Sequence, residues 1–299
     1  MSVTVYGFYG SLYTQIVYLA LAEKGVEFDR HAVNIGPALE NYEPWYARIH
    51  RNMVIPTIEH DGAYICESAA IVRYLDATFE GPPLLPADPA AREQALAWVD
   101  RISALPLREL SYSRITGVLA LLRDRVLMPR RLRILEKNKK KAPELAALYD
   151  ARIADVRSWI STIAQPAKIE AARTMLEKLL SELDTRLQSA DFIIGNNYSL
   201  ADTMATVLSA RMLALKIAEL SEYPALAAHY ARMKARPHFP KDDIVERIEL
   251  RRIIKIAIPF LLPRLLAWLV VLVLFALVLA ALIGNCEGYG PLAGPPPVT

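Results

Sequence analysis

Cysteine is scarce in this sequence, whose 299 residues include only Cys66 and Cys286. The two lie far apart and match no CxxC or zinc-ligand spacing, so we expect neither a disulfide scaffold nor a metal site. This scarcity is typical of a reducing compartment. The N-terminal segment also lacks the basic start and apolar run of a secretory signal peptide. We therefore expect most of the chain to remain on the side of the membrane where it is synthesised.

The sequence also lacks a large excess of charge. Charged residues make up 22% of it and the formal net charge is only +3. So small a charge gives no general attraction to nucleic acid, and we expect no nucleic-acid partner. Apolar residues make up 54%, which is enough to bury a core, and the length suits two modest domains.

Charge, proline and glycine are all missing from one long segment, residues 265–283, which reads LLAWLVVLVLFALVLAALI. As a helix it would span about 28 Å, close to the hydrocarbon core of a bilayer. The alternative is a buried core helix. Residues 247–264 before it carry five basic side chains and one acidic, whereas the tail 284–299 has no basic side chain. The positive-inside rule then predicts a single-pass helix with the preceding domains in the cytoplasm. The membrane would be a bacterial inner membrane, or an organelle membrane in a eukaryote.

Residues 1–80 alternate between strand-like and helix-like patterns. Their order, βαβ and then ββα, predicts an α/β domain with a mixed sheet. The predicted strands cover 3–8, 26–34 and a hairpin within 54–68, and the predicted helices cover 14–25 and 67–79. A segment with four prolines, 80–89, predicts a linker, and residues 90–246 show only helical periodicity.

One stretch of the helical region is strongly basic. Residues 123–141 carry nine basic and two acidic side chains, a local net charge of +7. One interpretation is a solvated surface excursion of the helical domain. The other is contact with anionic lipid headgroups, which a nearby membrane anchor would favour.

Pro56 lies in the segment VIPTI, where a strand is expected to begin. It is either an ordinary edge-strand proline or the cis-proline found in thioredoxin-like domains. In the second case the backbone of Ile55 would be presented to the cysteine of a peptide ligand.

Glu67 and Ser68 follow at the junction of a strand and a helix. Backbone N–H groups and a hydroxyl at a helix start suit a carboxylate, and Glu67 could accept from an ammonium group. A simple N-cap by Ser68 is the alternative.

Three hydroxyls follow the first strand: Ser11, Tyr13 and Thr14. One of them, Ser11 first, could donate to a thiolate and favour its ionised form, whereas Ser11 or Thr14 could instead only cap the helix. Ser199 and Asp202 form a capping-box pattern that predicts the start of a core helix. Cys66 is expected to pack as a small apolar residue.

Taken in order, VIPTI, ESAAIVRYL and GNNYSLADTMATVLSARM resemble the glutathione S-transferase superfamily over residues 3–240. The resemblance implies a thioredoxin-like N-terminal domain, an all-α C-terminal domain and a homodimer. It implies that glutathione, as co-substrate, binds through Ile55, Pro56, Glu67 and Ser68. Several stretches are similar to bacterial tetrachlorohydroquinone dehalogenases. The basic stretch and C-terminal anchor are similar to membrane-anchored ganglioside-induced differentiation-associated proteins.

The sequence departs from two patterns of that superfamily. The dehalogenases carry a cysteine two positions after the serine, whereas this chain has Tyr13 there. Chemistry through an enzyme–glutathione disulfide is therefore not expected. Tyrosine-type classes place a phenol where this chain has Gly7. Two functions follow: a membrane-anchored transferase that conjugates glutathione to an apolar electrophile at Ser11, or a non-catalytic module that binds a ligand, lipid or protein partner.

Overall fold

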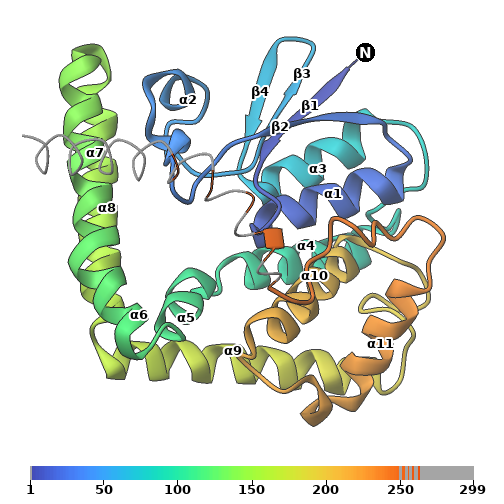
Figure 1. The fold of residues 1–299 in the computed structure, drawn as a ribbon. Coiled ribbons are helices and arrows are strands. Elements are labelled where there is room, and N and C mark those ends of the chain that lie inside the picture. Colours follow the sequence, from blue (N-terminus) through green and yellow to red (C-terminus); the bar gives the residue numbers. More distant parts are fainter. Residues whose placement is uncertain (1, 249–250, 253–254, 256–257, 259–261, 263–299) are drawn as a thin grey trace, which may run out of the picture. The chain divides into compact units, whose positions relative to one another are not determined.

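A computed structural model of the protein describes residues 2–248, 251, 252, 255, 258 and 262 (Figure 1). The chain divides into two compact units, 1–248 and 249–299. The predicted membrane helix 265–283 lies outside the described residues. Within the described part of the chain, no helix combines the length and apolar character needed to cross a bilayer.

The N-terminal domain is built on a four-stranded mixed sheet in the order β2-β1-β3-β4. Strand β1 pairs in parallel with β2 and antiparallel with β3, and β3 pairs antiparallel with β4. The elements are β1 (Val3–Gly7), α1 (Leu12–Lys24), β2 (Phe28–Ala32), the short helix η1 (Glu40–Tyr42), α2 (Pro44–Ile49), β3 (Thr57–His60), β4 (Ala63–Cys66) and α3 (Ser68–Thr78). The predicted βαβ–ββα order is confirmed. The short helices over 40–49 were not predicted, because they are too short to show a period.

Helices α1 and α3 pack together against this sheet, as Figure 1 shows. Ile16 and Leu19 of α1, Ile58 of β3, and Ile71 and Leu75 of α3 form a fully or almost fully buried core there. Each such side chain contributes on the order of 1.5–3 kcal/mol when it leaves water.

The second domain is helical, as predicted. Its helices are α4 (Pro89–Ser103), α5 (Leu107–Ser113), α6 (Gly117–Leu122), α7 (Met128–Lys141), α8 (Ala146–Ile163), α9 (Pro166–Leu187), α10 (Leu200–Leu215) and α11 (Pro224–Lys234), with a π-helical turn η2 (Arg123–Leu127) and short helices η3 (Pro143–Leu145) and η4 (Leu220–Glu222). Nearly all of α10 is buried, against α1 and α4. This packing joins the two domains into one body.

The basic stretch 123–141 packs into the helical domain along one face, although most of its charged side chains are exposed or half-buried. It forms η2 and α7, and α7 lies alongside α8 (Figure 1). Met128 and Leu135 are buried, and Asn138 donates a 2.8 Å hydrogen bond to the backbone oxygen of Tyr42 in η1. The hydroxyl of Tyr149 in α8 donates to the same oxygen at 2.9 Å. The α7–α8 pair is therefore fastened to the N-terminal domain.

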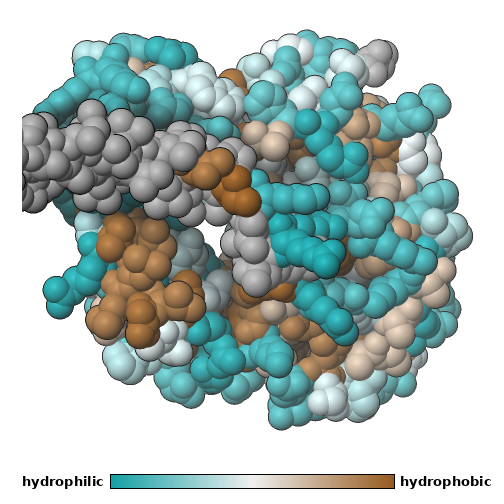
Figure 2. All heavy atoms as spheres, in the orientation of Figure 1, coloured by the Kyte–Doolittle hydropathy of each residue, from teal (hydrophilic) through white to brown (hydrophobic). Residues whose placement is uncertain are grey.

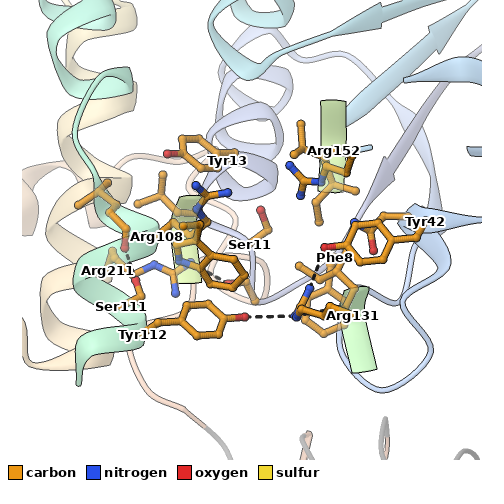
Figure 3. Close-up of a pocket in the computed structure, with 18 residues that line it drawn as sticks. Phe8, Ser11, Tyr13, Tyr42, Arg108, Ser111, Tyr112, Arg131, Arg152 and Arg211 are labelled. Carbon is orange, nitrogen blue, oxygen red and sulfur yellow. Dashed lines mark hydrogen bonds between the residues drawn. The ribbon is translucent and has the colours of Figure 1, made fainter. Parts of the chain in front are cut away.

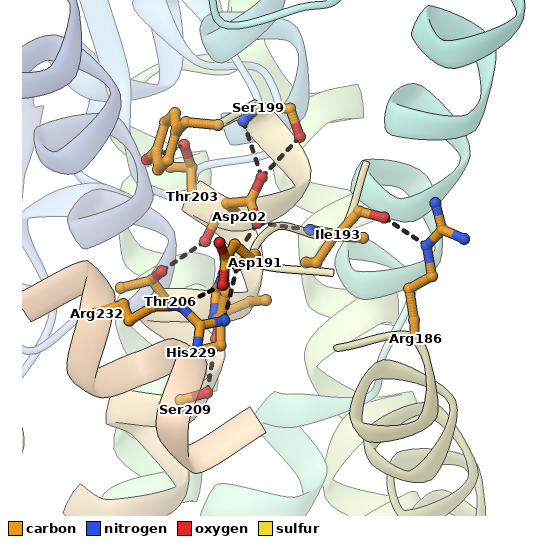
Figure 4. A network of polar contacts seen from close by, with 12 residues as sticks. Arg186, Asp191, Ile193, Ser199, Asp202, Thr203, Thr206, Ser209, His229 and Arg232 are labelled. Atoms are coloured by element: carbon orange, nitrogen blue, oxygen red, sulfur yellow. Dashed lines mark hydrogen bonds and ion pairs between the residues drawn. The ribbon is translucent and has the colours of Figure 1, made fainter. Parts of the chain in front are cut away.

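The capping box at the start of α10 is confirmed (Figure 4). The Asp202 carboxylate is fully buried and accepts from the backbone N–H and hydroxyl of Ser199, at 2.8 and 2.9 Å. It also accepts from the N–H of Ile193 and hydrogen-bonds to His229, both at 2.9 Å. One side chain thus ties the loop before α10, the start of α10 and α11 together.

Candidate active site

A cavity of about 300 Å³ lies where the two domains meet (Figure 3). One wall comes from the turn after β1, from η1 and from the residues before β3. The other comes from α5, α7, α8 and α10. Segments that are far apart in the sequence therefore build it jointly.

Ser11 and Tyr13 both line the cavity. Ser11 is the N-cap of α1, and its Oγ accepts a long 3.4 Å hydrogen bond from the N–H of Thr14. Because Oγ acts there as an acceptor, the hydroxyl proton of Ser11 stays available to a thiolate. Burial raises the pKa of Tyr13, so its phenol is a protonated donor at neutral pH.

Thr14 does not line the cavity. Its side chain is fully buried and accepts a 3.4 Å hydrogen bond from the N–H of Phe8. A Cβ built on Gly7 would lie 2.4 Å from the Cγ2 atom of Thr14. Thr14 therefore fills the space in front of Gly7, and a tyrosine at position 7 would require Thr14 to move.

The peptide bond between Ile55 and Pro56 is cis, as the thioredoxin-like interpretation requires. Ile55 lines the cavity, and the β1–β3 ladder begins only at Thr57. The backbone of Ile55 therefore stands beyond the last ladder pair, beside Ser11 and Tyr13 in one cavity.

Glu67 and Ser68 stand where β4 passes into α3. The N-cap is Glu67 and Ser68 is the first helical residue, so the alternative of an N-cap by Ser68 is wrong. As the first residue of α3, Ser68 has a backbone N–H without an acceptor inside the helix. Glu67 has φ 67° and ψ 119°, a conformation that a non-glycine residue rarely adopts and that is typical of functional sites.

The Glu67 carboxylate is 56% exposed and accepts a 2.9 Å hydrogen bond from the side chain of Asn52. It lines a second hollow, which shares Val54, Arg108 and Arg152 with the main cavity. The two adjoining hollows bring Glu67 toward the same space as Ser11 and Ile55. A short peptide could extend from one hollow into the other.

Four arginines of the helical domain line the cavity, and sequence reasoning missed them all as site residues: Arg108 on α5, Arg131 on α7, Arg152 on α8 and Arg211 on α10 (Figure 3). Arg108 pairs with Glu109 and Asp155. Arg211 donates a 2.7 Å hydrogen bond to the backbone oxygen of Gly10. A weak signal for Arg131 was present, since Met128, Arg131 and Leu135 share one face of α7.

Arg211 places a positive charge on the turn that carries Ser11 and Tyr13. Burial lowers the pKa of its guanidinium to about 10, and Tyr13 opposes this effect. Arg211 is therefore still protonated at neutral pH. Among the described residues it has no carboxylate partner, so its charge is free to act on a neighbouring anion.

Comparison with known sequences identifies both domains. A profile of the glutathione S-transferase N-terminal domain matches residues 5–83, and one of the C-terminal domain matches residues 130–237. The chain is 37% identical to the tetrachloro-p-hydroquinone reductive dehalogenase of Sphingobium chlorophenolicum, over 79% of this chain and 94% of the relative. It is 25% identical to the glutathione S-transferase TCHQD of Arabidopsis thaliana, over 77% of this chain and 85% of the relative.

Solved structures agree on the fold. The beta-etherase LigF of Sphingobium sp. strain SYK-6 superposes with a TM-score of 0.62 at 21% identity, covering 81% of this chain and 98% of the other. A glutathione-bound theta class transferase from Xanthomonas axonopodis pv. citri gives 0.58 at 24% identity, covering 81% and 97%. With both domain profiles matched and a relative 37% identical over most of its length, the chain belongs to the glutathione S-transferase family of glutathione-dependent enzymes.

Proposed function

We propose that this protein is a membrane-attached transferase that conjugates the thiolate of glutathione to an electrophile with an apolar, ring-shaped body. One observation carries the proposal. The candidate thiol-site residues Ser11, Tyr13 and Ile55 share a single cavity with the aromatic side chains of Tyr112 and Trp159. The cavity can therefore hold a thiol and an apolar ring side by side.

Glutathione would lie across the two adjoining hollows. Its γ-glutamyl carboxylate would meet the free N–H groups at the start of α3, next to Ser68, and its ammonium group would meet Glu67. The backbone of Ile55 would pair with its cysteine. This arrangement leaves the sulfur beside Ser11 and Tyr13.

The protein would contribute positioning and a lowered thiol pKa. The Ser11 hydroxyl donates a hydrogen bond to the sulfur, which favours the thiolate over the thiol. The nearby charge of Arg211 acts in the same direction. The thiolate then attacks the electrophilic carbon and the leaving group departs.

The reductive dehalogenation named for one relative is not part of this proposal. Tyr13 stands where the dehalogenase pattern has its cysteine, and a phenol cannot form a mixed disulfide with glutathione. Cys66 does not replace that cysteine, because its thiol contacts the backbone oxygen of Ile49 at 3.3 Å and burial raises its pKa.

We place the enzyme at a membrane surface, anchored by residues 265–283 with the two domains in the cytoplasm. The described part of the chain offers one supporting feature, an apolar ridge on α6 and η2 (Figure 2). The side chains of Val118, Leu119 and Leu121 are 80%, 65% and 60% exposed. So much exposed apolar surface in one place is typical of a contact with a partner or a lipid.

The catalytic proposal is tested with 1-chloro-2,4-dinitrobenzene and glutathione. We expect conjugation by the full-length chain, and a loss of about tenfold or more in kcat for Ser11→Ala, because one charge-assisted hydrogen bond to the thiolate is lost. Ser189→Ala, at an exposed serine just after the end of α9, is the control. Since Ser11 also caps α1, thermal melting must show that the variant is folded.

The second candidate function is non-catalytic binding, which the exposed ridge on α6 favours as a docking surface. It predicts glutathione binding without turnover of any electrophile. Equal turnover by the wild type and by Ser11→Ala would instead show that Ser11 is only a helix cap.

A further inference from the structure

We propose that the electrophile is an aromatic carboxylic acid, whose carboxylate docks on Arg131 and Arg152 beside Tyr42. This inference rests on the proposed function, because it names the substrate class of the same cavity. The substrate would then have an apolar ring and also a negatively charged group.

Arg131 is a cation that contacts only neutral groups. Its guanidinium donates to the hydroxyls of Tyr42 and Tyr112, at 3.2 and 3.3 Å, and to the backbone oxygen of Ile35 at 3.4 Å. In the part of the chain that the structure describes, no carboxylate pairs with it. These hydrogen bonds are long, so a charged acceptor would replace weak contacts with a stronger one.

The positive charge of Arg152 is only partly balanced, because its carboxylate partner is shared with a second arginine. Arg152 donates a 2.8 Å hydrogen bond to Asp155, and the same carboxylate also accepts from Arg108 at 3.2 Å. The Nε atom of Arg152 is buried and has no partner in the structure. A buried guanidinium N–H without an acceptor is costly, and a ligand oxygen would satisfy it.

The four arginines of the cavity are opposed by two carboxylates, Glu109 and Asp155, among the residues that contact them. This leaves a local charge of about +2 in a cavity between two domains. Charges are poorly screened in such a place, so an anion is attracted strongly there.

Aromatic side chains surround this charge. The rings of Tyr112 and Trp159 lie 4.7 Å apart in an edge-to-face arrangement, and the Arg131 guanidinium lies 5.7 Å from the Trp159 ring. Arg152 lies 5.6 Å from the ring of Tyr42. Flat apolar walls with cations at their edge suit a flat ring that carries an acidic group.

Glutathione is the other possible source of such an anion, through its glycyl carboxylate. Two features favour the electrophile. Arg131 lines the main cavity and does not line the hollow of Glu67, whereas Arg152 lines both. The arginines also contact the aromatic side chains that would hold the ring. The experiment distinguishes the two sources.

The reaction that follows is a nucleophilic aromatic substitution. The glutathione thiolate forms a carbon–sulfur bond to the ring, the carbon–halogen bond breaks, and halide leaves with the electron pair. The thiol proton passes to solvent beforehand, so no oxidant or reductant is needed. Arg131 and Arg152 hold the acidic group and take no part in the proton transfer.

The test uses the full-length chain in detergent micelles, as wild type, Arg131→Gln and Arg133→Gln. Arg133 is an exposed residue of α7 and serves as the matched control. The substrates are 4-chloro-3,5-dinitrobenzoate and its neutral methyl ester. Calorimetry measures the Kd of unreactive 3,5-dinitrobenzoate and, separately, of glutathione.

We expect Arg131→Gln to lower kcat/KM for the acid and to weaken 3,5-dinitrobenzoate binding, each by about tenfold or more, because a charge-assisted hydrogen bond is lost. The ester rate and the glutathione Kd should change by no more than about threefold. Arg133→Gln should match the wild type. If Arg131→Gln is not folded by thermal melting, Arg131→Met, which keeps an apolar side chain at this position, takes its place.

An unchanged ratio of acid to ester rates, with unchanged 3,5-dinitrobenzoate binding, overturns the inference. A weaker glutathione Kd with that ratio unchanged also overturns it and assigns the arginines to the glycyl carboxylate. If the wild type shows neither turnover nor glutathione binding, the transferase proposal is wrong, independently of the acid site. The binding of 3,5-dinitrobenzoate, which needs no catalysis, then still decides on the acid site.

Discussion

The effect of Arg211 on ionisation of the bound thiol can be measured separately from any effect on glutathione binding. Arg211 belongs to α10, the buried helix that joins the domains, and it reaches the Gly10 carbonyl on the turn of Ser11. With a pKa of about 10 it keeps its charge at neutral pH, where an activated thiol would ionise. It should therefore act on the ionisation of the bound thiol.

A cation favours the thiolate, so it lowers the thiol pKa and moves the rising limb of the pH–rate profile to lower pH. We expect Arg211→Gln to move that limb to higher pH by about one unit, equivalent to about 1.4 kcal/mol. Arg211→Lys keeps the charge and should retain most of the wild-type profile. The measurement is kcat against pH with saturating glutathione. An unshifted limb in Arg211→Gln would show that Arg211 is only a structural contact.

The residues that we propose to bind glutathione were all candidates from the sequence, but the arginines of the cavity were not. Ile55, Glu67 and Ser68 fall in two short motifs whose order identifies the family. Arg131 lies outside the family motifs and Arg211 near the end of the third one, and both are on helices whose orientation depends on the fold. A basic stretch does not by itself show which of its charges faces inward.

Among the elements, α7 shows why the basic stretch was difficult to interpret. Its charge favoured a solvated surface, yet one face of the helix is buried through Met128, Leu135 and Asn138. Lys139 pairs with Asp150 and Lys141 with Glu43 at the protein surface, so part of the net charge is balanced by neighbouring carboxylates. The helical domain itself was predictable, because its periodicity is long and continuous.

The start of α10 allows a test of stability. Asp202→Ala would leave four buried donors without their acceptor, which should lower the free energy of unfolding by about 3 kcal/mol or more. Asp191→Ala is the control, because Asp191 forms an exposed ion pair with Arg232 and should change stability by about 0.5 kcal/mol or less. Urea unfolding followed by circular dichroism measures both. Equal losses in the two variants would contradict the role given to the capping box.

The ridge on α6 allows a test of membrane contact. Two substitutions, Leu119→Ser and Leu121→Ser, should together weaken binding of the two-domain chain, residues 1–248, to anionic vesicles by about tenfold, because leucines that enter the bilayer interface each contribute up to about 1.5–3 kcal/mol. Charge reversal at Lys139, Lys140 and Lys141 should weaken binding further at low salt. Arg131 is left unchanged, because it lines the cavity.

The control is Met175→Ser, which removes a half-exposed apolar side chain on α9, outside the ridge. Sedimentation with vesicles is the measurement. Failure of the unaltered residues 1–248 to sediment with anionic vesicles at low salt would contradict lipid contact by this surface.

For the whole molecule, the compact unit 1–248 defines the part that should be stable without the proposed anchor. Its C-terminal end is held, since Glu246 accepts hydrogen bonds from Tyr230 and Lys234. We expect a chain that ends at Ile248 to be folded and to form a two-fold homodimer, which would place both anchors in one bilayer. Light scattering at tens of micromolar measures the mass, and a monomer would contradict this expectation.

In the proposed enzyme, glutathione binds across the two hollows, with Glu67 and Ser68 at one end and the sulfur beside Ser11. Calorimetric titration of the full-length chain with glutathione tests this placement most directly. We predict saturable binding, and at least about tenfold weaker binding in the double variant Glu67→Ala, Ser68→Ala, equivalent to about 1.4 kcal/mol or more. Glu80→Gln, at an exposed position after α3, should bind like the wild type. No heat of binding at millimolar glutathione in the wild type, or an unchanged affinity in the double variant, would contradict the account.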